Sequence, residues 1–280
     1  MAEAADKFVA VIINDIKSNC LKLPSLPEVA MRVRRAVEDE NSSAEQVAKV
    51  INADPSLSAR LLRAANSAAY RGARPIESTQ AAVTRLGSTV VRNLVSSLVT
   101  QQLFQSHSAF LMKRMRVLWS HSAEVAVISQ AFARRFTKLP PDQAMLAGLL
   151  HDIGKLPMLT RAEDFPDVMK DEKMLDAALD KLHPVVGKFL LEAWKFPPEI
   201  VAAASEHEDL GRYTEKPDYV DIVLLANLHS YIGKPHPYAK VNWLDIPALS
   251  KLKLTPAESL LALEEAKAEM AEMRSLLGNV

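Results

Sequence analysis

The sequence holds a single cysteine, Cys20, among its 280 residues. One cysteine cannot form an intramolecular disulfide, which excludes a small disulfide-stabilised scaffold and indicates a reducing compartment. Apolar runs of the roughly 20 residues needed to cross a bilayer are also missing. The first seven residues, MAEAADK, carry acids where a secretory signal peptide would carry bases. We therefore expect a cytoplasmic protein that makes no use of a membrane.

An excess of charge is missing as well, because 34 basic residues balance 34 acidic ones and no block of five like charges occurs. Bulk electrostatics thus gives no evidence for binding to nucleic acid or to an anionic membrane. Glycine is scarce, with 8 residues, well below the usual share of about 7%. The chain is instead 49% hydrophobic, and its apolar residues recur at spacings of three and four in alanine-rich segments. This pattern predicts an all-α protein with a substantial core.

Capping signals mark several of the expected helix starts. Ser43 with Gln46, and Thr255 with Glu258, have the spacing of capping boxes. Asp54-Pro55 supplies an N-cap followed by proline at the first helical position. We also expect Ser25 to begin a helix that runs to about residue 38.

Proline leads to two expectations about the C-terminal half. His183-Pro184 is expected to begin a helix, since proline is favoured at the first helical position. Residues 235–249 contain three prolines and are expected to form an extended arm on the surface. Gly148 lies one turn before Asp152, and its missing side chain should allow another helix to approach closely.

The segment Ala147–Lys155 places adjacent His151 and Asp152 at the end of an apolar helix. An imidazole nitrogen and a carboxylate oxygen can both bind one divalent cation. His121 lies on a long helix expected at about residues 110–136. It should point inward, because it shares a face with the apolar residues Val117, Val125, Ile128 and Phe132. Together with His183 and His207 in later helices, these residues form a hypothetical metal site.

Each of these residues also has a structural interpretation. His121 could be a hydrogen-bonded core histidine, and His151 with Asp152 a hydrogen-bonded pair. His183 could cap a helix start, and His207 could be a solvated residue among neighbouring acids. Chain order alone does not decide between these interpretations and the metal site.

Several motifs, in order along the chain, resemble the HDOD domain, the HD-related output domain of bacterial signalling proteins. They are Leu23–Pro27, Ile51–Leu62, Ala65–Ser67, Ala81–Gly87, Leu118–His121 and Gly148–Gly154. The resemblance covers about residues 21–210 and implies a two-lobed all-α fold whose second lobe is similar to HD-type metal-dependent phosphohydrolases. We accordingly expect an N-terminal lobe over residues 1–106 and an HD-like lobe over 107–235. An arm and helix over 236–280 would pack on the HD-like lobe.

The resemblance also implies a set of metal ligands. Catalytic HD enzymes use a helix His, an adjacent His-Asp pair and a later Asp. These correspond to His121, to His151 with Asp152, and to Asn227. An amide offers a carbonyl oxygen but no negative charge, so a hard cation is attracted less strongly there. Lys155 matches the lysine that follows the HD-type glycine and would neutralise charge that develops on a phosphoryl group.

Similarity to the bimetallic HD-GYP phosphodiesterases extends this set to a second ion. Their additional histidine corresponds to His183, and their His-His pair appears here as Glu206-His207. Glu206 could still coordinate a metal. The Gly-Tyr-Pro signature is absent after Asp209–Tyr213. The ligand set is therefore incomplete by comparison with these enzymes.

Two functions follow from the sequence. The first is a signalling or regulatory module that acts through protein interaction and has a degenerate HD-type metal site. The alternative is a metal-dependent phosphohydrolase that acts on a nucleotide or cyclic dinucleotide phosphoester, with Asp152 and Lys155 as catalytic residues. The cofactor would be a divalent metal, namely Fe, Mn, Mg, Ni or Zn. The expected partners are an unidentified signalling protein or a phosphoester ligand, and the incomplete ligand set favours the regulatory function.

Overall fold

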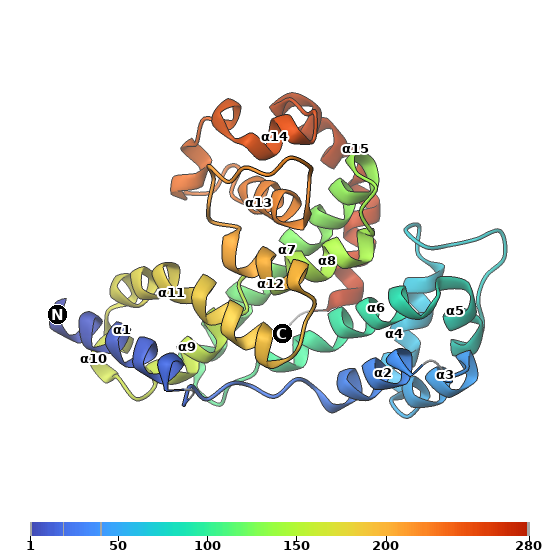
Figure 1. Cartoon of the computed structure of the whole chain (residues 1–280), viewed down its shortest axis with the longest axis horizontal. Helices are drawn as coiled ribbons and strands as arrows, with labels where there is room; N and C mark the ends of the chain where they lie inside the picture. Colours follow the sequence, from blue (N-terminus) through green and yellow to red (C-terminus); the bar gives the residue numbers. More distant parts are fainter. Residues whose placement is uncertain (1, 19, 40, 279–280) are drawn as a thin grey trace.

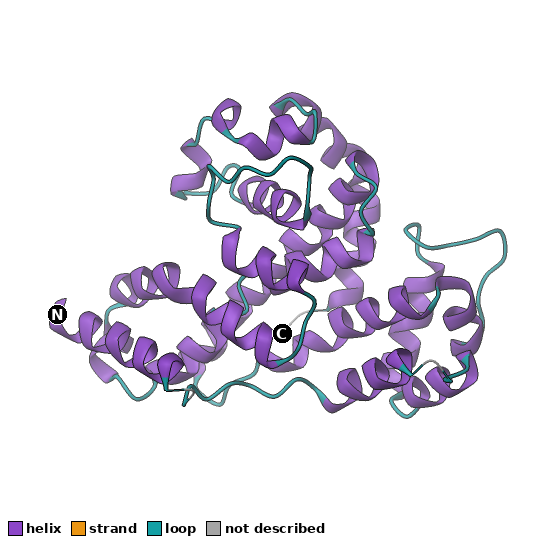
Figure 2. Cartoon of the chain, viewed as in Figure 1, coloured by secondary structure: helices purple, strands orange, loops and turns teal. Residues whose placement is uncertain are grey.

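The computed structural model describes residues 2–18, 20–39 and 41–278. These residues form α-helices and three short 3-10 helices, and none of them lies in a strand, which confirms the all-α prediction (Figure 2). The first seven helices are α1 (Ala2–Lys17), α2 (Glu28–Glu38), α3 (Ala44–Asn52), α4 (Pro55–Asn66), α5 (Thr79–Leu86), α6 (Ser88–Thr100) and α7 (Ala109–Phe136). The next five are α8 (Pro141–Leu150), α9 (Lys155–Ala162), α10 (Pro166–Lys170), α11 (Glu172–Ala193) and α12 (Pro198–Glu206). The last three are α13 (Tyr219–Ser230), α14 (Pro247–Lys251) and α15 (Pro256–Leu277), and the 3-10 helices are η1 (Gln101–Leu103), η2 (Pro237–Lys240) and η3 (Trp243–Asp245).

The helices gather into two lobes (Figure 1). Helices α2 to α6 pack on one another and form the N-terminal lobe, while α7, α8, α11, α12 and α13 form the centre of the second lobe. Helix α1 lies beside α10 and α11, away from α2 to α6 (Figure 1). Helix α15 packs along α7 and also contacts α4 and α6. The first helix, α1, therefore packs on the second lobe. The last helix, α15, packs on the second lobe and also contacts the N-terminal lobe. No helix in the described part of the chain has the length and hydrophobicity that a membrane crossing requires.

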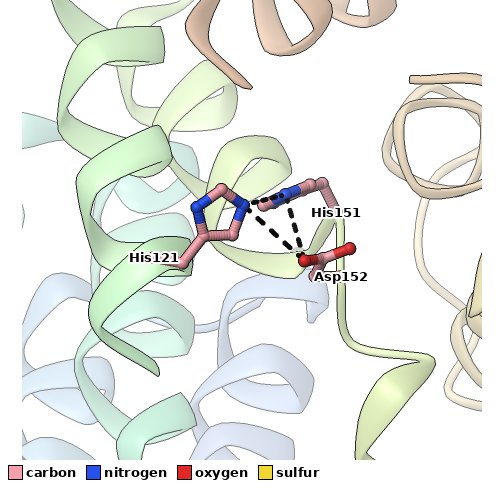
Figure 3. Close-up of side chains that lie close together, drawn as sticks. All are labelled: His121, His151 and Asp152. Atoms are coloured by element: carbon pink, nitrogen blue, oxygen red, sulfur yellow. Dashed lines mark hydrogen bonds and ion pairs between the residues drawn. The ribbon is translucent and has the colours of Figure 1, made fainter. Parts of the chain in front are cut away.

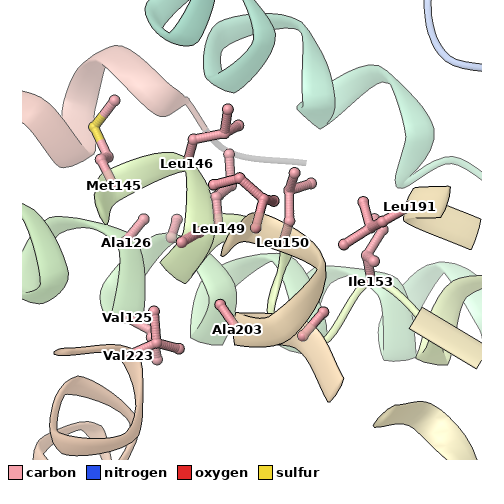
Figure 4. Close-up of a cluster of buried hydrophobic side chains, with 14 of the residues drawn as sticks. Val125, Ala126, Met145, Leu146, Leu149, Leu150, Ile153, Leu191, Ala203 and Val223 are labelled. Atoms are coloured by element: carbon pink, nitrogen blue, oxygen red, sulfur yellow. The ribbon is translucent and has the colours of Figure 1, made fainter. Parts of the chain in front are cut away.

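The core of the second lobe lies where α8 crosses α7. The buried apolar residues there include Val125, Ala126, Met145, Leu146, Leu149 and Leu150 (Figure 4). Gly148 makes the close crossing possible: a Cβ atom at this position would lie 2.6 Å from Ser129 Oγ and 2.9 Å from the Val125 carbonyl oxygen. The expected close helix approach at Gly148 is thus confirmed. This crossing fixes the end of α8, and with it the turn that holds His151 and Asp152.

Polar side chains join the two lobes. The Arg34 guanidinium donates hydrogen bonds to the carbonyl oxygens of Trp194, at 2.7 Å, and of Lys195 near the C-terminal end of α11. Buried Asn93 on α6 donates to the carboxylate of buried Asp142 on α8, at 2.7 Å. These bonds satisfy helix-end carbonyls and a buried carboxylate, so they favour one arrangement of the lobes.

Most capping predictions are confirmed, and one is wrong. Both capping boxes form, at Ser43 and at Thr255, and Asp54 accepts a hydrogen bond from the Leu57 amide. Ser25, in contrast, does not begin a helix, because the chain stays extended until Pro27 and α2 starts at Glu28. Pro24 and Pro27 flank Ser25 and Leu26, and a residue that precedes proline, as Leu26 does, is disfavoured in the helical region.

Two further expectations about the C-terminal half are wrong. His183-Pro184 does not begin a helix, because both residues lie inside α11, whose N-cap is Asp171, with a side chain that accepts from the Met174 amide. Residues 235–249 are not an extended arm, since they form η2, η3 and the first turn of α14. His236 and Asn242 explain part of this result, because their side chains cap η2 and η3.

A buried histidine connects α13, α15 and η3. His229 Nδ1 donates to the Leu225 carbonyl oxygen at 2.8 Å, Nε2 lies 2.9 Å from Ser259 Oγ, and the ring packs edge-on against Trp243. Burial lowers the pKa of His229 to about 4, although its bond to the Leu225 carbonyl acts in the opposite direction. The neutral form is therefore the one that the fold accommodates.

His229 should make the fold sensitive to acid. Because the folded-state pKa lies below the ordinary value, the unfolded chain binds the proton first as the pH falls, and stability is lost between about pH 6.5 and about pH 4. We expect His229→Gln, which cannot titrate, to reduce this loss by about 3 kcal/mol, the equivalent of the pKa shift. Urea unfolding of both proteins at about pH 7 and about pH 4 measures the difference. Equal losses in the two proteins would contradict the assignment.

Candidate metal centre

Three helices and a turn bring five of the predicted site residues together. His121 comes from α7, His183 from the middle of α11 and His207 from the end of α12. His151 and Asp152 lie in the turn between α8 and α9. All except His121 are fully buried, and His121 is partly exposed. The solvated interpretation of His207 and the helix-start interpretation of His183 are therefore wrong.

Asp152 lies at the centre of this cluster. Its Oδ2 atom is 3.7 Å from His121 Nε2 and 3.6 Å from His151 Nε2 (Figure 3). Its Oδ1 atom is 3.0 Å from His183 Nε2 and 3.7 Å from His207 Nε2. Each carboxylate oxygen thus faces one pair of imidazoles, and the two sets of three ligand atoms share Asp152.

Backbone carbonyls fix the tautomers of three of these histidines. Nδ1 lies 2.7 Å from the Gly148 carbonyl oxygen in His151, 2.9 Å from that of Leu179 in His183 and 3.1 Å from that of Ala203 in His207. A carbonyl oxygen can only accept, so Nδ1 carries the proton in each ring. In the neutral imidazole, Nε2 then has a free lone pair that points toward Asp152.

His121 has the same tautomer by a different route. Its Nδ1 lies 3.4 Å from Ser230 Oγ, and this hydroxyl donates its own hydrogen to the Asn227 carbonyl oxygen at 2.7 Å. Ser230 can therefore only accept from His121, which leaves the proton on Nδ1 and the lone pair on Nε2. Asn227 is buried on α13 and is connected to His121 through this serine.

The Nε2 atoms approach one another in pairs. His121 Nε2 is 3.2 Å from His151 Nε2, and His183 Nε2 is 3.2 Å from His207 Nε2. Two lone pairs at this distance repel unless a proton or a metal cation lies between them. Burial lowers the pKa of His121 to about 4, and it lowers the pKa of His151 well below the ordinary range, despite the opposing effect of Asp152. Extra protons are thus disfavoured at neutral pH for these two rings, and a metal cation fits better.

The spacing of the ligand atoms agrees with metal coordination. Nitrogen and oxygen ligands lie about 2.1 Å from a zinc-sized ion, so in a tetrahedral arrangement they are roughly 3.4 Å apart. The six separations within the two sets run from 3.0 to 3.7 Å. Asp152 Oδ1, at the centre of the cluster, also lacks a hydrogen bond of good geometry. The residues present therefore fit a divalent metal on either side of Asp152.

Lys155 stabilises the charged form of Asp152. Its Nζ atom lies 2.9 Å from Asp152 Oδ2 and 3.6 Å from Asp180 Oδ1. Burial alone would raise the pKa of Asp152, but the positive charge of Lys155 holds it well below the usual range. The pKa of Lys155 is raised in turn, because the attraction of Asp152 exceeds the effect of burial. The cluster therefore holds an ionised carboxylate among imidazoles that present lone pairs.

The structure does not bring Glu206 into this cluster. Its carboxylate is 46% exposed and accepts a hydrogen bond from Arg212 at 2.6 Å. Glu208 lies at the cluster instead, with Oε1 3.4 Å from His207 Nε2 and 3.7 Å from His183 Nε2. Burial raises the pKa of Glu208, while the hydrogen bond from the Tyr238 hydroxyl lowers it, and the net shift is below the ordinary value. The resemblance to a His-His pair points to Glu206, the residue before His207, and gives no signal for Glu208, the residue after it.

A cleft of about 300 Å³ opens onto His121, Asp152 and Lys155. Its other lining residues are Lys113, Arg114, Val117, Leu118, Leu159, Glu172, Asp176, Leu179, Asp180 and Tyr231. Val117 was expected to face inward with His121, but it is 65% exposed and belongs to this cleft. Arg114 forms ion pairs with Asp176 and with Glu172, the latter at 3.5 Å. The cleft thus offers basic groups and an apolar wall next to the histidine cluster.

The chain is similar to a known protein family and to several known proteins and structures. The HDOD domain family matches residues 23–210. A proposed metal-dependent phosphohydrolase from Shewanella amazonensis SB2B has a crystal structure with a TM-score of 0.82 and 28% identity, covering 98% of this chain and 99% of that one. An HDOD domain protein of unknown function from Geobacter sulfurreducens shares the fold, with a TM-score of 0.64, 23% identity and coverage of 99% and 98%. An uncharacterized protein from Treponema pallidum is 24% identical over 240 residues, which are 78% of this chain but only 44% of that protein.

Proposed function

The chain belongs to the HDOD domain family, and from this premise we propose that it is a divalent-metal-dependent phosphohydrolase. One observation carries the proposal: four histidine Nε2 atoms, each with its proton placed on Nδ1, surround the two oxygens of ionised Asp152. Neutral imidazoles and a carboxylate are the ligands that divalent transition metals prefer in proteins. A hydrogen-bonded core would instead have placed a donor opposite each acceptor.

The residues divide into two positions for cations. His121, His151 and Asp152 would hold one, and Asp152, His183 and His207 would hold the other. When bound, a divalent cation lowers the pKa of a water molecule and polarises a phosphoryl oxygen. The bonds from Nδ1, to carbonyl oxygens in three rings and to Ser230 Oγ in His121, keep each ring in the orientation that this binding needs.

The cleft supplies what a phosphoester requires beyond the cations. Lys155 lines the cleft beside Asp152, and its ammonium group can neutralise charge on a phosphoryl oxygen. Arg114 and Lys113 also line the cleft and can bind other phosphate oxygens. The cleft volume of about 300 Å³ is at the small end of the range for ligand sites, which favours a substrate of nucleotide size or smaller.

Hydrolysis assays test this proposal. Protein stripped by a chelator should hydrolyse neither p-nitrophenyl phosphate nor bis(p-nitrophenyl) phosphate, and adding Mn²⁺ or Fe²⁺ should restore turnover of at least one of them. A panel of nucleotides and cyclic dinucleotides then identifies the substrate class. Protein that binds metal and still hydrolyses none of these compounds would contradict the proposed function.

A second candidate function is a regulatory module that acts through an unidentified signalling protein. Two observations favour it. Asn227 brings no charge to the position where catalytic HD enzymes have an aspartate, and Lys155 already pairs with Asp152 Oδ2. Both features weaken cation binding on the His121 side of the centre. Metal retention without turnover in the assays above would favour this function over hydrolysis.

A further inference from the structure

We propose that Glu208 is a second carboxylate ligand of the centre, held in place by Tyr238 from the segment that follows α13. This inference rests on the proposed metal centre and extends it by a residue that the predicted ligand set lacks. Glu208 follows the last turn of α12, directly after His207. Its side chain is about one third exposed, so it lies on the open side of the cluster, in contrast to the buried histidines.

The position of Glu208 completes a coordination shell. Oε1 lies 3.4 Å from His207 Nε2 and 3.7 Å from His183 Nε2. These separations match the roughly 3.4 Å expected between ligands of one tetrahedral ion. Asp152 Oδ1 lies at 3.0 and 3.7 Å from the same two nitrogens. Each of these two imidazoles thus faces one oxygen of Asp152 and one of Glu208. On this proposal the His183 side of the centre is a four-ligand position.

Charge balance gives an independent reason for a second carboxylate. Two divalent cations bring four positive charges, and within the predicted ligand set only Asp152 and Glu206 could carry a negative one. Glu206 pairs with Arg212 outside the cluster, and Asn227 is neutral. Buried charge is costly unless it is compensated nearby. Glu208 supplies the missing compensation at the position that Asp152 shares with His183 and His207.

Tyr238 fixes the orientation of the Glu208 carboxylate. The Tyr238 hydroxyl donates a hydrogen bond to Oε2, which leaves Oε1 directed at the histidines. Tyr238 lies on η2 and packs edge-on against Tyr231 and His236, whose rings stack at 3.6 Å. A hydrogen bond of this kind to a metal-binding carboxylate is worth about 10- to 100-fold in affinity. Residues 231–238 therefore act on cation binding through Tyr238.

Manganese binding tests the inference, with a neighbouring glutamate as the matched control. Protein stripped by a chelator is titrated with Mn²⁺ in equilibrium dialysis, and the bound metal is counted by elemental analysis. We expect wild type to bind two ions. Glu208→Gln should lose one ion or bind it at least about 10-fold more weakly, and Tyr238→Phe should weaken the same ion by about 10-fold. Glu206→Gln should bind both ions as wild type does.

The outcomes separate this inference from the proposed function. Two ions bound by Glu208→Gln with wild-type affinity would overturn the role of Glu208 and leave the metal centre intact. No ion bound by wild type would overturn both proposals. Glu208→Gln and Tyr238→Phe each keep the shape of the side chain. Tyr238→Phe affects the Glu208 carboxylate only by removing its hydrogen bond. Thermal unfolding of the stripped proteins checks that each variant is folded before the titration.

Discussion

Asp152→Asn is expected to abolish metal binding and to lower kcat/KM by about 10³-fold or more, because it removes the one charge that both cation positions share. The carboxylate lies between four imidazoles, with each oxygen facing two of them. The amide keeps the shape of the side chain but places a donor where one of these oxygens was. Elemental analysis and kinetics with the restored metal, on the same preparations, measure both effects.

Asp180→Asn is the control for this variant. Asp180 lines the same cleft and lies 3.6 Å from Lys155 Nζ, but its carboxylate is 69% exposed and is not among the predicted ligands. We expect wild-type metal content and a loss of activity below about 10-fold, as is usual for exposed charges. Equal losses of metal in the two variants would show that general charge in the cleft, and not the position of Asp152, controls binding.

Gly154→Ala is expected to destabilise the protein by about 3 kcal/mol or more, near the upper end for overpacking. A Cβ atom at Gly154 would lie 2.5 Å from the Gly187 amide nitrogen and closer still to the His183 carbonyl oxygen. Both are backbone atoms of α11, which cannot move aside as a flexible side chain can. The start of α9 and the middle of α11 would have to separate. Urea unfolding of the stripped protein measures the change in the free energy of unfolding.

Gly211→Ala is the matched control for this prediction. The nearest atom to a Cβ at Gly211 is Asp209 Oδ1, at 3.7 Å, an ordinary contact distance. We expect its effect on unfolding to stay within about 0.5 kcal/mol, as at most surface positions. Because α11 carries His183, Gly154→Ala should also weaken metal binding. Wild-type stability of Gly154→Ala would contradict the close packing of α9 on α11.

Local signals in the sequence predicted much of the fold. The capping boxes at Ser43 and Thr255 depend on short-range hydrogen bonds, which residue spacing alone can indicate. His183-Pro184 was misread because proline is common at helix starts, yet Asp171 caps the helix earlier and Pro184 is tolerated within it. Whether a proline begins a helix or lies inside one depends on packing around the whole helix, which a short stretch of sequence does not contain.

Five residues of the candidate site were predictable from the sequence, but its geometry was not. His151 and Asp152 stand out as a pair, whereas the approach of His183 and His207 depends on how α11 and α12 pack. Glu206 and Glu208 show most clearly what the sequence does not predict about the site. Residues two apart near a helix end point in widely different directions, so only one of them can face the histidines. The sequence offers no signal that selects Glu208, because Tyr238, which orients it, lies 30 residues away.

Crystals soaked in Mn²⁺ test the central claim most directly. Anomalous diffraction at the manganese edge should show two peaks on either side of Asp152. One is expected among His121, His151 and Asp152, and the other among Asp152, His183, His207 and Glu208. Histidine rings that keep their Nε2 pairs at hydrogen-bond distance, with no anomalous peak between them and Asp152, would contradict the claim that this cluster is a metal centre.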